Sequence, residues 1–473
     1  MTQTHQKFTI HPVGQGFFYS GAIEFSRLDD VASLFNFVFD CGSMNKANCA
    51  DEIATYQKHH FPDDTSLDLL VISHFDQDHV NHIYKLLDGK RKVKKIVAPF
   101  LNFSERFLLF LRWISFPGPL ATGPEELFFI SLILDPVAAL TPLLDDKDGG
   151  IIFITSDPDN HPFTTGNPES NLPREPKGRI FHLDFGDISD NATGLRVKEV
   201  RDSERTTLSF GSIPVMEFLF YKKEIGKGEE EFYRKVHELF IAKYATFFKD
   251  PEKPLPEEIT EVIKTIRTAT VIEDLFKEAK KILKFEAYKY TKISDLNTSA
   301  LCMLHRNMAY LAPRHHPDNW DYISDDIEVK RIQKFEQLPP LFSRTVTPFG
   351  HWHRNRWFQP KNFPNALLTS DSFLLTKTDV DAFYKRYKNY WNQYWIFQVP
   401  HHGSDNNTDV TLLSSIPHAT EIFINYGIVK AWGGTWRHPS AQVITDIVAT
   451  GHSLHFSPVN ESAGIEFCYT LYR

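Results

Sequence analysis

The stretch LDLLVISHFDQDHVNHI, residues 67–83, determines the fold predicted for this chain. A nearly continuous apolar run ends there in five polar residues: His74, Asp76, Asp78, His79 and His82. We predict a buried strand over residues 67–73 and, after the polar turn, a helix that stops at Gly89. Apolar runs that fill a core seldom end in so many potential metal ligands, so the turn is expected to carry chemistry.

The composition is that of a globular chain of 473 residues, of which 42% are hydrophobic. Length alone favours two or three domain-sized units. The net charge of −8 argues against strong, unaided binding of nucleic acid, although a local basic groove is compatible with it. The four cysteines form no Cys-x-x-Cys pair, which argues against a disulfide scaffold and against a structural zinc knuckle.

The N-terminus has no charged start followed by an apolar run, so we expect no signal peptide. The most hydrophobic stretches, residues 107–116 and 127–140, are shorter than a membrane span and are interrupted by Arg, Asp or Pro. We interpret them as buried helices, with membrane-associated helices as the alternative. The sequence therefore predicts a cytoplasmic protein with reduced thiols and no membrane partner.

The chain is expected to form one α/β core that insertions interrupt. Residues 1–100 would supply the first half of the core and residues 286–473 the second half. Residues 101–285 are predicted to be an insertion region, mostly helical, with some core strands near 180–225. The glycine-punctuated segment 14–25, between two predicted strands, is interpreted as a hairpin connection.

The polar turn offers two imidazoles and two carboxylates. Alternate residues that leave a strand end, here His74 and Asp76, can converge on one ion, while the adjacent Asp78 and His79 can turn toward a second. Oxygen and imidazole donors without thiolate suit manganese, zinc or iron. Two neighbouring metal ions are a standard means of activating water in phosphoester hydrolysis. A solvated polar loop is the alternative interpretation.

Further motifs follow one another along the chain. They are VGQG at 13–16, FVFDCGS at 37–43, SHFDQDH at 73–79, LNTSALCML at 296–304, ALLTSD at 366–371, VPHHGS at 399–404 and GGTWRHPS at 433–440. In this order they resemble the metallo-β-lactamase fold and, more narrowly, the hydrolase domain of the DNA-uptake protein ComEC and its soluble relatives. The resemblance implies an α/β fold, a four-layer αββα metallo-β-lactamase sandwich with helical insertions.

The resemblance also implies a dinuclear centre with two divalent metal ions, manganese or zinc. His74 and Asp76 would hold one ion, and Asp78 and His79 the other. Asp371, at the end of its strand, would bridge the two ions. Asp40 would anchor the metal-binding turn from behind, since metal-bound histidines need such partners.

The remaining roles fall on residues in the second half of the chain. Adjacent histidines on extended backbone point to opposite faces, so we expect His401 to be a ligand and His402 to act behind it or as the acid. His438 is a candidate for binding the substrate phosphate or for the last metal position. Asn297 and Ser299 would orient a ligand or the attacking water. Asp78, His402 and His438 are thus the expected catalytic residues.

Two positions depart from the family pattern. Phe17 stands where relatives often have Asp, and Ser370 replaces Gly before Asp371. The third histidine motif of the family is not identifiable. Residues 347–363 mix Arg354 and Arg356 with aromatic residues, a composition that suits a groove for phosphates and bases, with a packed loop as the alternative.

These features predict a metal-dependent hydrolase of phosphodiester bonds, most simply a DNA or RNA nuclease that uses a metal-bridged hydroxide. Such a protein could be an effector of a bacterial antiviral defence system, a hypothesis that rests on the type of protein and on no residue. One alternative is a hydrolase of a small ester, lactam or cyclic nucleotide. Another is an interaction module of a larger complex, with residues 226–285 as the docking surface for a protein partner.

Overall fold

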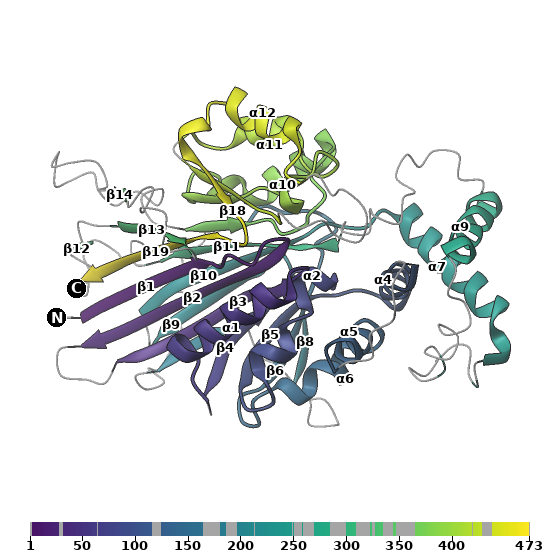
Figure 1. The fold of residues 1–473 in the computed structure, drawn as a ribbon, viewed down its shortest axis with the longest axis horizontal. Helices are drawn as coiled ribbons and strands as arrows, with labels where there is room; N and C mark the ends of the chain where they lie inside the picture. The colour runs from purple at the N-terminus through teal and green to yellow at the C-terminus, as the bar shows by residue number, and fades with distance from the viewer. Residues whose placement is uncertain are drawn as a thin grey trace.

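The chain folds into two large β-sheets that pack face to face, with helices on the outer face of each (Figure 1). The computed structural model describes residues 2–27, 32–63, 65–115, 124–163, 180–185, 196–211, 213–247, 249, 258, 269–283, 299–308, 322–323, 327–333, 344–346, 365–418, 420–427 and 438–472. Within these ranges, none of the helices has both the length and the apolar character needed to cross a membrane.

The first sheet contains 11 strands among the described residues. In spatial order they are β14 (Arg344–Val346), β13 (Ile327–Gln333), β19 (Ala463–Tyr472), β1 (Thr2–Ile10), β2 (Gly16–Arg27), β3 (Ser33–Ser43), β4 (Ser66–Val71), β5 (Lys92–Pro99), β6 (Gly150–Thr155) and β8 (Val197–Arg201), with β12 (Tyr322–Ile323) paired to β19. Pairing is parallel from β3 through β8, so these strands end at one edge of the sheet.

The second sheet contains eight strands among the described residues. In spatial order they are β18 (Phe456–Val459), β17 (Glu421–Asn425), β16 (Ile396–Gln398), β15 (Ala366–Leu368), β11 (Leu301–Asn307), β10 (Ile213–Lys222), β9 (Arg205–Phe210) and β7 (Phe181–Asp184). Pairing is parallel from β15 through β18. Each sheet therefore has a parallel half, and loops at the carboxyl ends of parallel strands are common places for a site.

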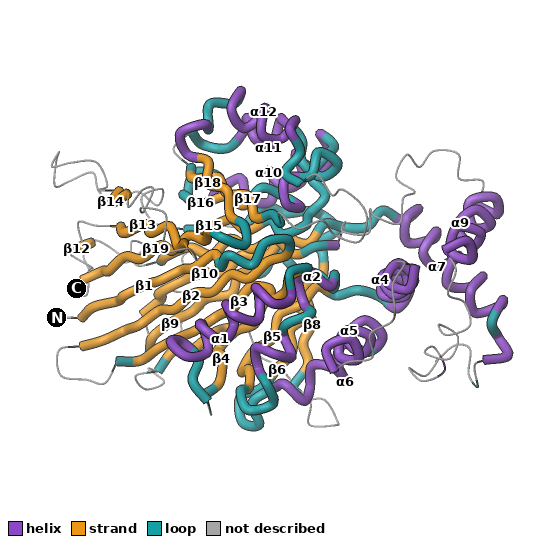
Figure 2. The backbone as a smooth tube through the Cα atoms, in the orientation of Figure 1, coloured by secondary structure: helices purple, strands orange, loops and turns teal. Residues whose placement is uncertain are grey.

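The helices divide between the two outer faces. Those over the first sheet are α1 (Lys46–His60), α2 (Gln77–Val80), α3 (Ile83–Leu87), α4 (Phe103–Ser115), α5 (Pro124–Leu134), α6 (Pro136–Leu140), α7 (Lys227–Lys243) and α9 (Ala269–Leu283). Those over the second sheet are α10 (Lys377–Tyr387), α11 (Val410–Ser415) and α12 (Ala441–Ala449). Helices α7 and α9 lie farthest from the strands (Figure 2).

Aromatic side chains fill the space between the sheets. Phe37 of β3 packs edge-on against Phe218 of β10, with ring centroids 5.3 Å apart, and also touches Phe8 of β1. Burying one such side chain contributes about 1.5–3 kcal/mol. This inner core joins strands from both ends of the chain and fixes the edge at which the polar turn lies.

The strand–turn–helix–strand order predicted around the polar turn is confirmed by β4, α2, α3 and β5. The interpretation of segment 14–25 as a hairpin connection is wrong, because β2 runs through it and pairs with both β1 and β3. Its Gly21 makes room for a neighbour: a Cβ there would lie 2.1 Å from a ring carbon of Phe37. Strand β6 lies in a region predicted to be mostly helical.

Candidate metal centre

The polar turn links the carboxyl end of β4 to α2. Its two histidines are buried. The turn faces the loops that follow β15 and β16 of the second sheet, which bring Asp371, His401 and His402. The predicted ligands therefore meet where parallel strands of both sheets end.

Asp40 reaches the turn through a bulge in β3. The pairing of β2 with β3 shifts register there and skips Asp40, whose φ is +56°. Such bulges re-aim a side chain, often beside a functional site. The Asp40 carboxylate accepts a hydrogen bond from the backbone N–H of Ser73 at 2.7 Å and another from His79 Nδ1 at 2.8 Å.

The bond to Asp40 sets the tautomer of His79. Since Nδ1 carries the proton, the lone pair of Nε2 is free for a ligand, which is the usual arrangement behind a metal-binding histidine. Ser73 Oγ has a similar place behind His74, 2.8 Å from its Nδ1. Ser73 Oγ also donates to Asp40 and contacts Ser370 Oγ at 2.6 Å.

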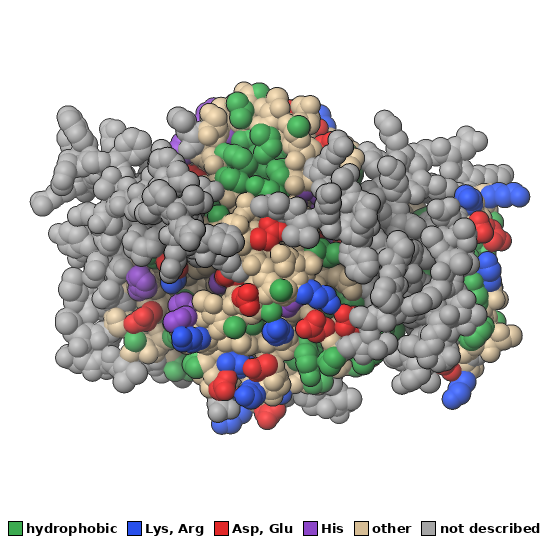
Figure 3. All heavy atoms as spheres, viewed as in Figure 1, with side chains coloured by type: hydrophobic (Ala, Val, Ile, Leu, Met, Phe, Trp, Pro, Cys, Tyr) green, Lys and Arg blue, Asp and Glu red, His purple; other side chains and the backbone are tan. Residues whose placement is uncertain are grey.

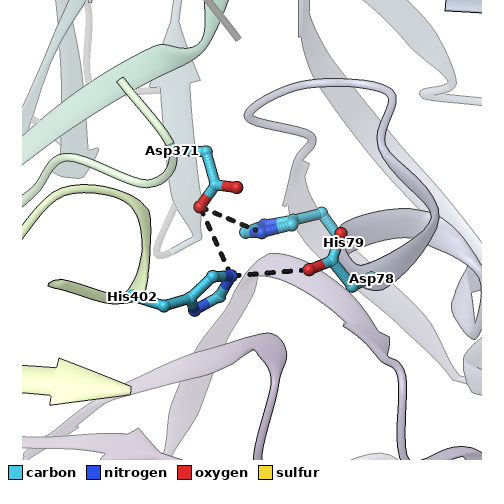
Figure 4. A group of neighbouring side chains, drawn as sticks. All are labelled: Asp78, His79, Asp371 and His402. Atoms are coloured by element: carbon cyan, nitrogen blue, oxygen red, sulfur yellow. Dashed lines mark ion pairs between the residues drawn. The ribbon is translucent and has the colours of Figure 1, made fainter. Parts of the chain in front are cut away.

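Asp371 lies at the centre of the cluster, and its two oxygens face different partners. Figure 4 shows His79 and His402 converging on this carboxylate, with Asp78 beside His402. Asp371 Oδ1 lies 3.4 Å from His79 Nε2 and 3.6 Å from His402 Nε2. Asp371 Oδ2 lies 3.7 Å from His74 Nε2 and 3.5 Å from His401 Nε2.

The two carboxylates of the turn, Asp76 and Asp78, each lie beside a histidine of the cluster. Asp78 Oδ2 is 3.4 Å from His402 Nε2, and Asp76 Oδ2 is 4.0 Å from His74 Nε2. Donor atoms of Asp78, His79, Asp371 and His402 all lie within 4.8 Å of one another, and so do donor atoms of Asp40, His74 and His79. These separations leave room for an ion between the donors, and the donor set suits a divalent cation.

The burial of the histidine nitrogens shows whether the residues fit a cation. The Nε2 atoms of His74, His79 and His402 are buried and have no hydrogen-bond partner among the described residues. A buried polar atom left without a partner costs roughly 1–3 kcal/mol. Three such nitrogens directed at one carboxylate would each gain a partner from a cation, so the residues fit a bound cation.

The electrostatics point the same way. Burial would raise the pKa of Asp371, but His401, His402 and His79 hold it well below its usual range. The pKa of Asp78 is also lowered, since His402 and His79 outweigh its burial. The carboxylates are therefore ionised, which favours a cation between them.

The pKa values of the imidazoles are shifted in two directions. Burial lowers the pKa of His74. Burial would also lower the pKa values of His79 and His402, but Asp371, with Asp40 at His79 and Asp78 at His402, outweighs it and raises both. Positive charge is thus favoured beside Asp371, and a divalent cation would supply it in place of two protons.

The loops that carry the ligands have left-handed backbone. The φ values are +49° at Ser370, +46° at His401 and +54° at His402. Non-glycine residues seldom adopt such values and do so mainly at functional sites. The expectation that His401 and His402 lie on extended backbone and point apart is therefore wrong, and both imidazoles reach Asp371.

Several supporting residues escaped the sequence analysis. Asn407 Oδ1 lies 2.7 Å from His401 Nδ1, and the backbone oxygen of Asn425 lies 2.8 Å from His402 Nδ1. The backbone oxygen of Asn425 can accept a hydrogen bond from His402 Nδ1, an arrangement that leaves Nε2 for a ligand. These partners lie close after the VPHHGS motif or at a strand end, but only the fold shows which of them the imidazoles contact.

Two glycines allow the loops to approach the turn. A Cβ on Gly16 would lie 2.4 Å from the carbonyl oxygen of Asp78, and a Cβ on Gly42 would lie 2.6 Å from the carbonyl carbon of His79. The VGQG and FVFDCGS motifs thus place backbone against backbone beside the ligands.

The other predicted site residues are placed unevenly. The ring of His438 lies 5.6 Å from that of His401, so the structure brings His438 to the cluster. Burial, with His401 and His402, lowers the pKa of His438 to about 4. Ser299 is buried just before Leu301, whose backbone N–H donates to Ser73 at 2.7 Å. Asn297, Arg354 and Arg356 lie outside the described residues.

A second acidic group, Asp157, Asp159 and His161, lies on the loop after β6. The oxygens of Asp157 accept hydrogen bonds from backbone N–H groups of this loop, and Asp157 also faces the buried guanidinium of Arg386 at 3.6 Å. Because the Asp157 carboxylate already has these partners, we interpret the group as a contact that stabilises the loop.

No protein-family model matches the chain, and no curated protein matches it. Among solved structures the chain is similar to the crystal structure of a long-form RNase Z from yeast, with 13% sequence identity and a TM-score of 0.18. The match covers 30% of this chain and 17% of the yeast chain. A likeness of this extent carries no argument about the site, which rests on its geometry.

Proposed function

We propose that this chain is a dinuclear, metal-dependent phosphodiesterase built on the metallo-β-lactamase fold, with nucleic acid as its substrate. The order of the sequence motifs, which resembles that of the ComEC hydrolase domain, supports the fold, and the four-layer arrangement agrees with it. In this proposal residues 1–100 and 286–473 form the two core halves, and residues 101–285 are the insertion region.

One observation carries the proposal. Histidine nitrogens from both halves of the chain converge on the two oxygens of one buried carboxylate, and three of them lack any hydrogen-bond partner among the described residues. A purely structural polar cluster would satisfy these atoms internally. A bridging carboxylate between two sets of imidazole and carboxylate donors is typical of a two-metal hydrolase.

The two sets follow from the distances to Asp371. Its Oδ2 side offers His74, Asp76 and His401, and its Oδ1 side offers Asp78, His79 and His402. Two bound divalent ions, manganese or zinc, would lower the pKa of water and neutralise charge on the substrate phosphate. His402 thereby becomes a proposed ligand equal to His401.

His438 is left as the side chain that would meet the substrate. Its low pKa keeps it neutral near pH 7, so it would donate an N–H to a phosphate or leaving oxygen without adding positive charge. Ser299 is buried two residues before Leu301, the start of β11 and the residue that donates to Ser73, and Ser299 would help to orient the substrate. Asn297, Arg354 and Arg356 keep their proposed substrate roles from the sequence.

The surface limits how a nucleic acid could bind. On the face seen in Figure 3, Lys and Arg are interspersed with Asp and Glu over the described part of the sandwich, and the whole chain has a net charge of −8. Strong binding to phosphates needs clustered positive charge. We therefore propose a short substrate segment at the metal centre, or a protein partner docked on residues 226–285 that delivers it.

The test is a cleavage assay with manganese on plasmid DNA, single-stranded RNA and bis(p-nitrophenyl) phosphate. We expect cleavage by the wild-type protein and its loss in Asp78→Ala. The matched control is Asp381→Asn, whose carboxylate is exposed on α10 and pairs only with Lys377 among the described residues. Cleavage of the small diester alone would indicate a small-molecule hydrolase, and absence of all cleavage with both ions bound would refute the proposal.

A further inference from the structure

Two buried carboxamides connect the loops around the metal centre. Gln398 is the last residue of β16 and Asn425 is the last residue of β17, with 1% and 2% of their surfaces exposed. Gln398 Oε1 accepts the backbone N–H of Ser370 at 2.8 Å, and Gln398 Nε2 donates to Asn425 Oδ1 at 2.9 Å. Asn425 Nδ2 donates to the backbone oxygen of Gly16 at 2.6 Å. This chain of hydrogen bonds therefore joins three loops that border the ligands.

The partners fix the orientation of both carboxamides. The N–H of Ser370 can only donate and the carbonyl of Gly16 can only accept, so neither amide can turn over without losing a bond. The backbone oxygen of Gln398 also accepts Thr369 Oγ1 at 2.8 Å. The backbone oxygen and both side-chain polar atoms of Gln398 thus have partners, which determines the position of the carboxamide.

These bonds act on the strained backbone that carries the ligands. Ser370, which Gln398 holds, has left-handed φ and directly precedes Asp371. Gln398 also donates to the side chain of Asn425, whose backbone oxygen lies 2.8 Å from His402 Nδ1. Backbone of this kind persists only where the surroundings determine it. A shift of one carboxamide would therefore change the separation of Asp371 Oδ1 and His402 Nε2, which is 3.6 Å.

We propose that Gln398 is a positioning residue that sets the spacing of Asp371 and His402 and so the affinity for the ion on the Asp371 Oδ1 side. The inference rests on the proposed function in that it takes the cluster to bind two ions. The Oδ2 side has its own supports, Ser73 behind His74 and Asn407 behind His401. Loss of the Gln398 carboxamide therefore weakens one ion more than the other.

The experiment is calorimetric titration of the metal-free protein with Mn²⁺, in the wild type and in Gln398→Met. Methionine keeps the volume but removes both side-chain hydrogen bonds. We expect one ion to bind as in the wild type and the second to bind about 10- to 100-fold more weakly, the usual effect of losing a support behind a ligand. If Gln398→Met bound each ion with the same affinity as the wild type, the inference would be overturned.

Gln6→Met is the matched control. Gln6 is buried on β1 and accepts a hydrogen bond from Tyr469, in the core between the sheets. This variant loses a buried amide, so it should unfold at a similarly lowered temperature, yet it should bind both ions as the wild type does. If Gln6→Met also lost the second ion, the effect would be general destabilisation and the proposal would fail.

A second variant protects the test against misfolding of Gln398→Met. Gln398→Glu keeps an acceptor for the Ser370 N–H but cannot donate to Asn425, and we expect it to weaken the second ion by about 10-fold with the fold intact. Wild-type affinity in Gln398→Glu would contradict the proposal. A wild-type protein that binds two Mn²⁺ ions but cleaves no phosphodiester would refute the proposed function alone, and one that binds none would refute both.

Discussion

Ser370 has a left-handed backbone conformation, and it stands where the family that the sequence motifs resemble has glycine. Its φ is +49°, and its hydroxyl contacts Ser73 Oγ at 2.6 Å and lies 3.4 Å from His74 Nδ1. A left-handed non-glycine residue costs about 1–2 kcal/mol. The hydroxyl pair ties together residues 297 positions apart in sequence, and we infer that it orients His74.

Replacing Ser370 by Gly and by Ala separates the two effects. Both changes remove the hydroxyl, and we expect both to weaken the ion near His74 by about 10-fold. Only Gly removes the strain, so Ser370→Gly should be more stable to urea than Ser370→Ala by about 1 kcal/mol. Calorimetry with Mn²⁺ and urea unfolding measure the two quantities. Wild-type ion affinity in both variants would show that the hydroxyl does not support His74.

At this scale the sequence predicted which side chains gather but not how they are held. His74, Asp76, Asp78 and His79 could be named because they end an apolar strand, and Asp371 because ALLTSD resembles a motif of the metallo-β-lactamase family. The turn at His401 and His402 could not, since two adjacent histidines give no sign of left-handed backbone. Gln398 and Asn425 were missed because a buried amide acquires its role only from partners distant in sequence.

At the scale of elements, the end of β3 packs directly against α2 through Gly42. A Cβ at Gly42 would lie 2.6 Å from the carbonyl carbon of His79 and 2.7 Å from the carbonyl oxygen of Asp78. Backbone atoms cannot swing aside as a side chain can, so the added carbon must displace the turn. The contact therefore sets the distance between a strand of the sheet and the ligands.

We expect Gly42→Ala to reduce manganese-dependent cleavage by at least 10-fold, because the turn that holds Asp78 and His79 is displaced. Gly150→Ala on β6 is the control, since its nearest neighbour would be the flexible end of Lys95 at 3.3 Å. Steady-state cleavage of bis(p-nitrophenyl) phosphate measures both. Similar rates in the two variants would mean that the close approach at Gly42 does not position the turn.

His305 of β11 links the two sheets away from the metal centre. Its Nε2 lies 2.6 Å from the hydroxyl of Tyr19 on β2, and its ring packs on Phe8 with centroids 4.6 Å apart. Burial lowers the pKa of His305 from 6.5 to about 3. In the unfolded chain the imidazole regains its ordinary pKa, so between these values the unfolded state binds the extra proton.

Stability should therefore fall as the pH falls below about 6.5, with His305 contributing up to ~1.4 kcal/mol per pH unit. The double variant Tyr19→Phe/His305→Phe removes both polar partners and should unfold within about 1 kcal/mol of the wild type at pH 7. Between pH 4 and 6 the slope of its unfolding free energy against pH should be smaller than in the wild type, because about one proton fewer is taken up on unfolding. Tyr19→Phe alone keeps the histidine and serves as control; an unchanged slope in the double variant would exclude His305 as the source.

Helices and strands could be predicted where the hydrophobic periodicity was strong. The prediction failed where a glycine could indicate either a turn or close packing within a strand. The apolar run of β4 and the helices Phe103–Ser115 and Pro124–Leu134 follow directly from their sequence patterns. Segment 14–25 was misread because Gly21 suggested a turn, whereas it makes room for the Phe37 ring inside a strand. Strand β6 was missed because its apolar run is short, and periodicity alone does not distinguish such a run from a buried helical segment.

At the scale of the whole molecule, the candidate metal centre connects the two halves of the chain. The proposed ligands come from residues 74–79 and from residues 371–402. These residues lie where strands of the two sheets end, beside the core that both sheets share. The sequence motifs predicted that these regions meet, but the packing of one sheet on the other that brings them together depends on contacts such as Phe37 against Phe218. The folded chain alone presents all donors at once, so ions should bind it far better than they bind the unfolded chain.

Metal binding should therefore stabilise the whole fold. At a free Mn²⁺ concentration 100 times the dissociation constant, one ion adds about 2.7 kcal/mol to the free energy of unfolding. We expect a chelator to lower the urea midpoint of the wild type and added Mn²⁺ to restore it. Asp371→Asn should show the same urea midpoint with and without Mn²⁺, because it replaces the carboxylate that faces both sets of proposed ligands. Asp381→Asn should retain the full response; a wild-type midpoint that ignores Mn²⁺ would mean that the cluster does not bind this ion.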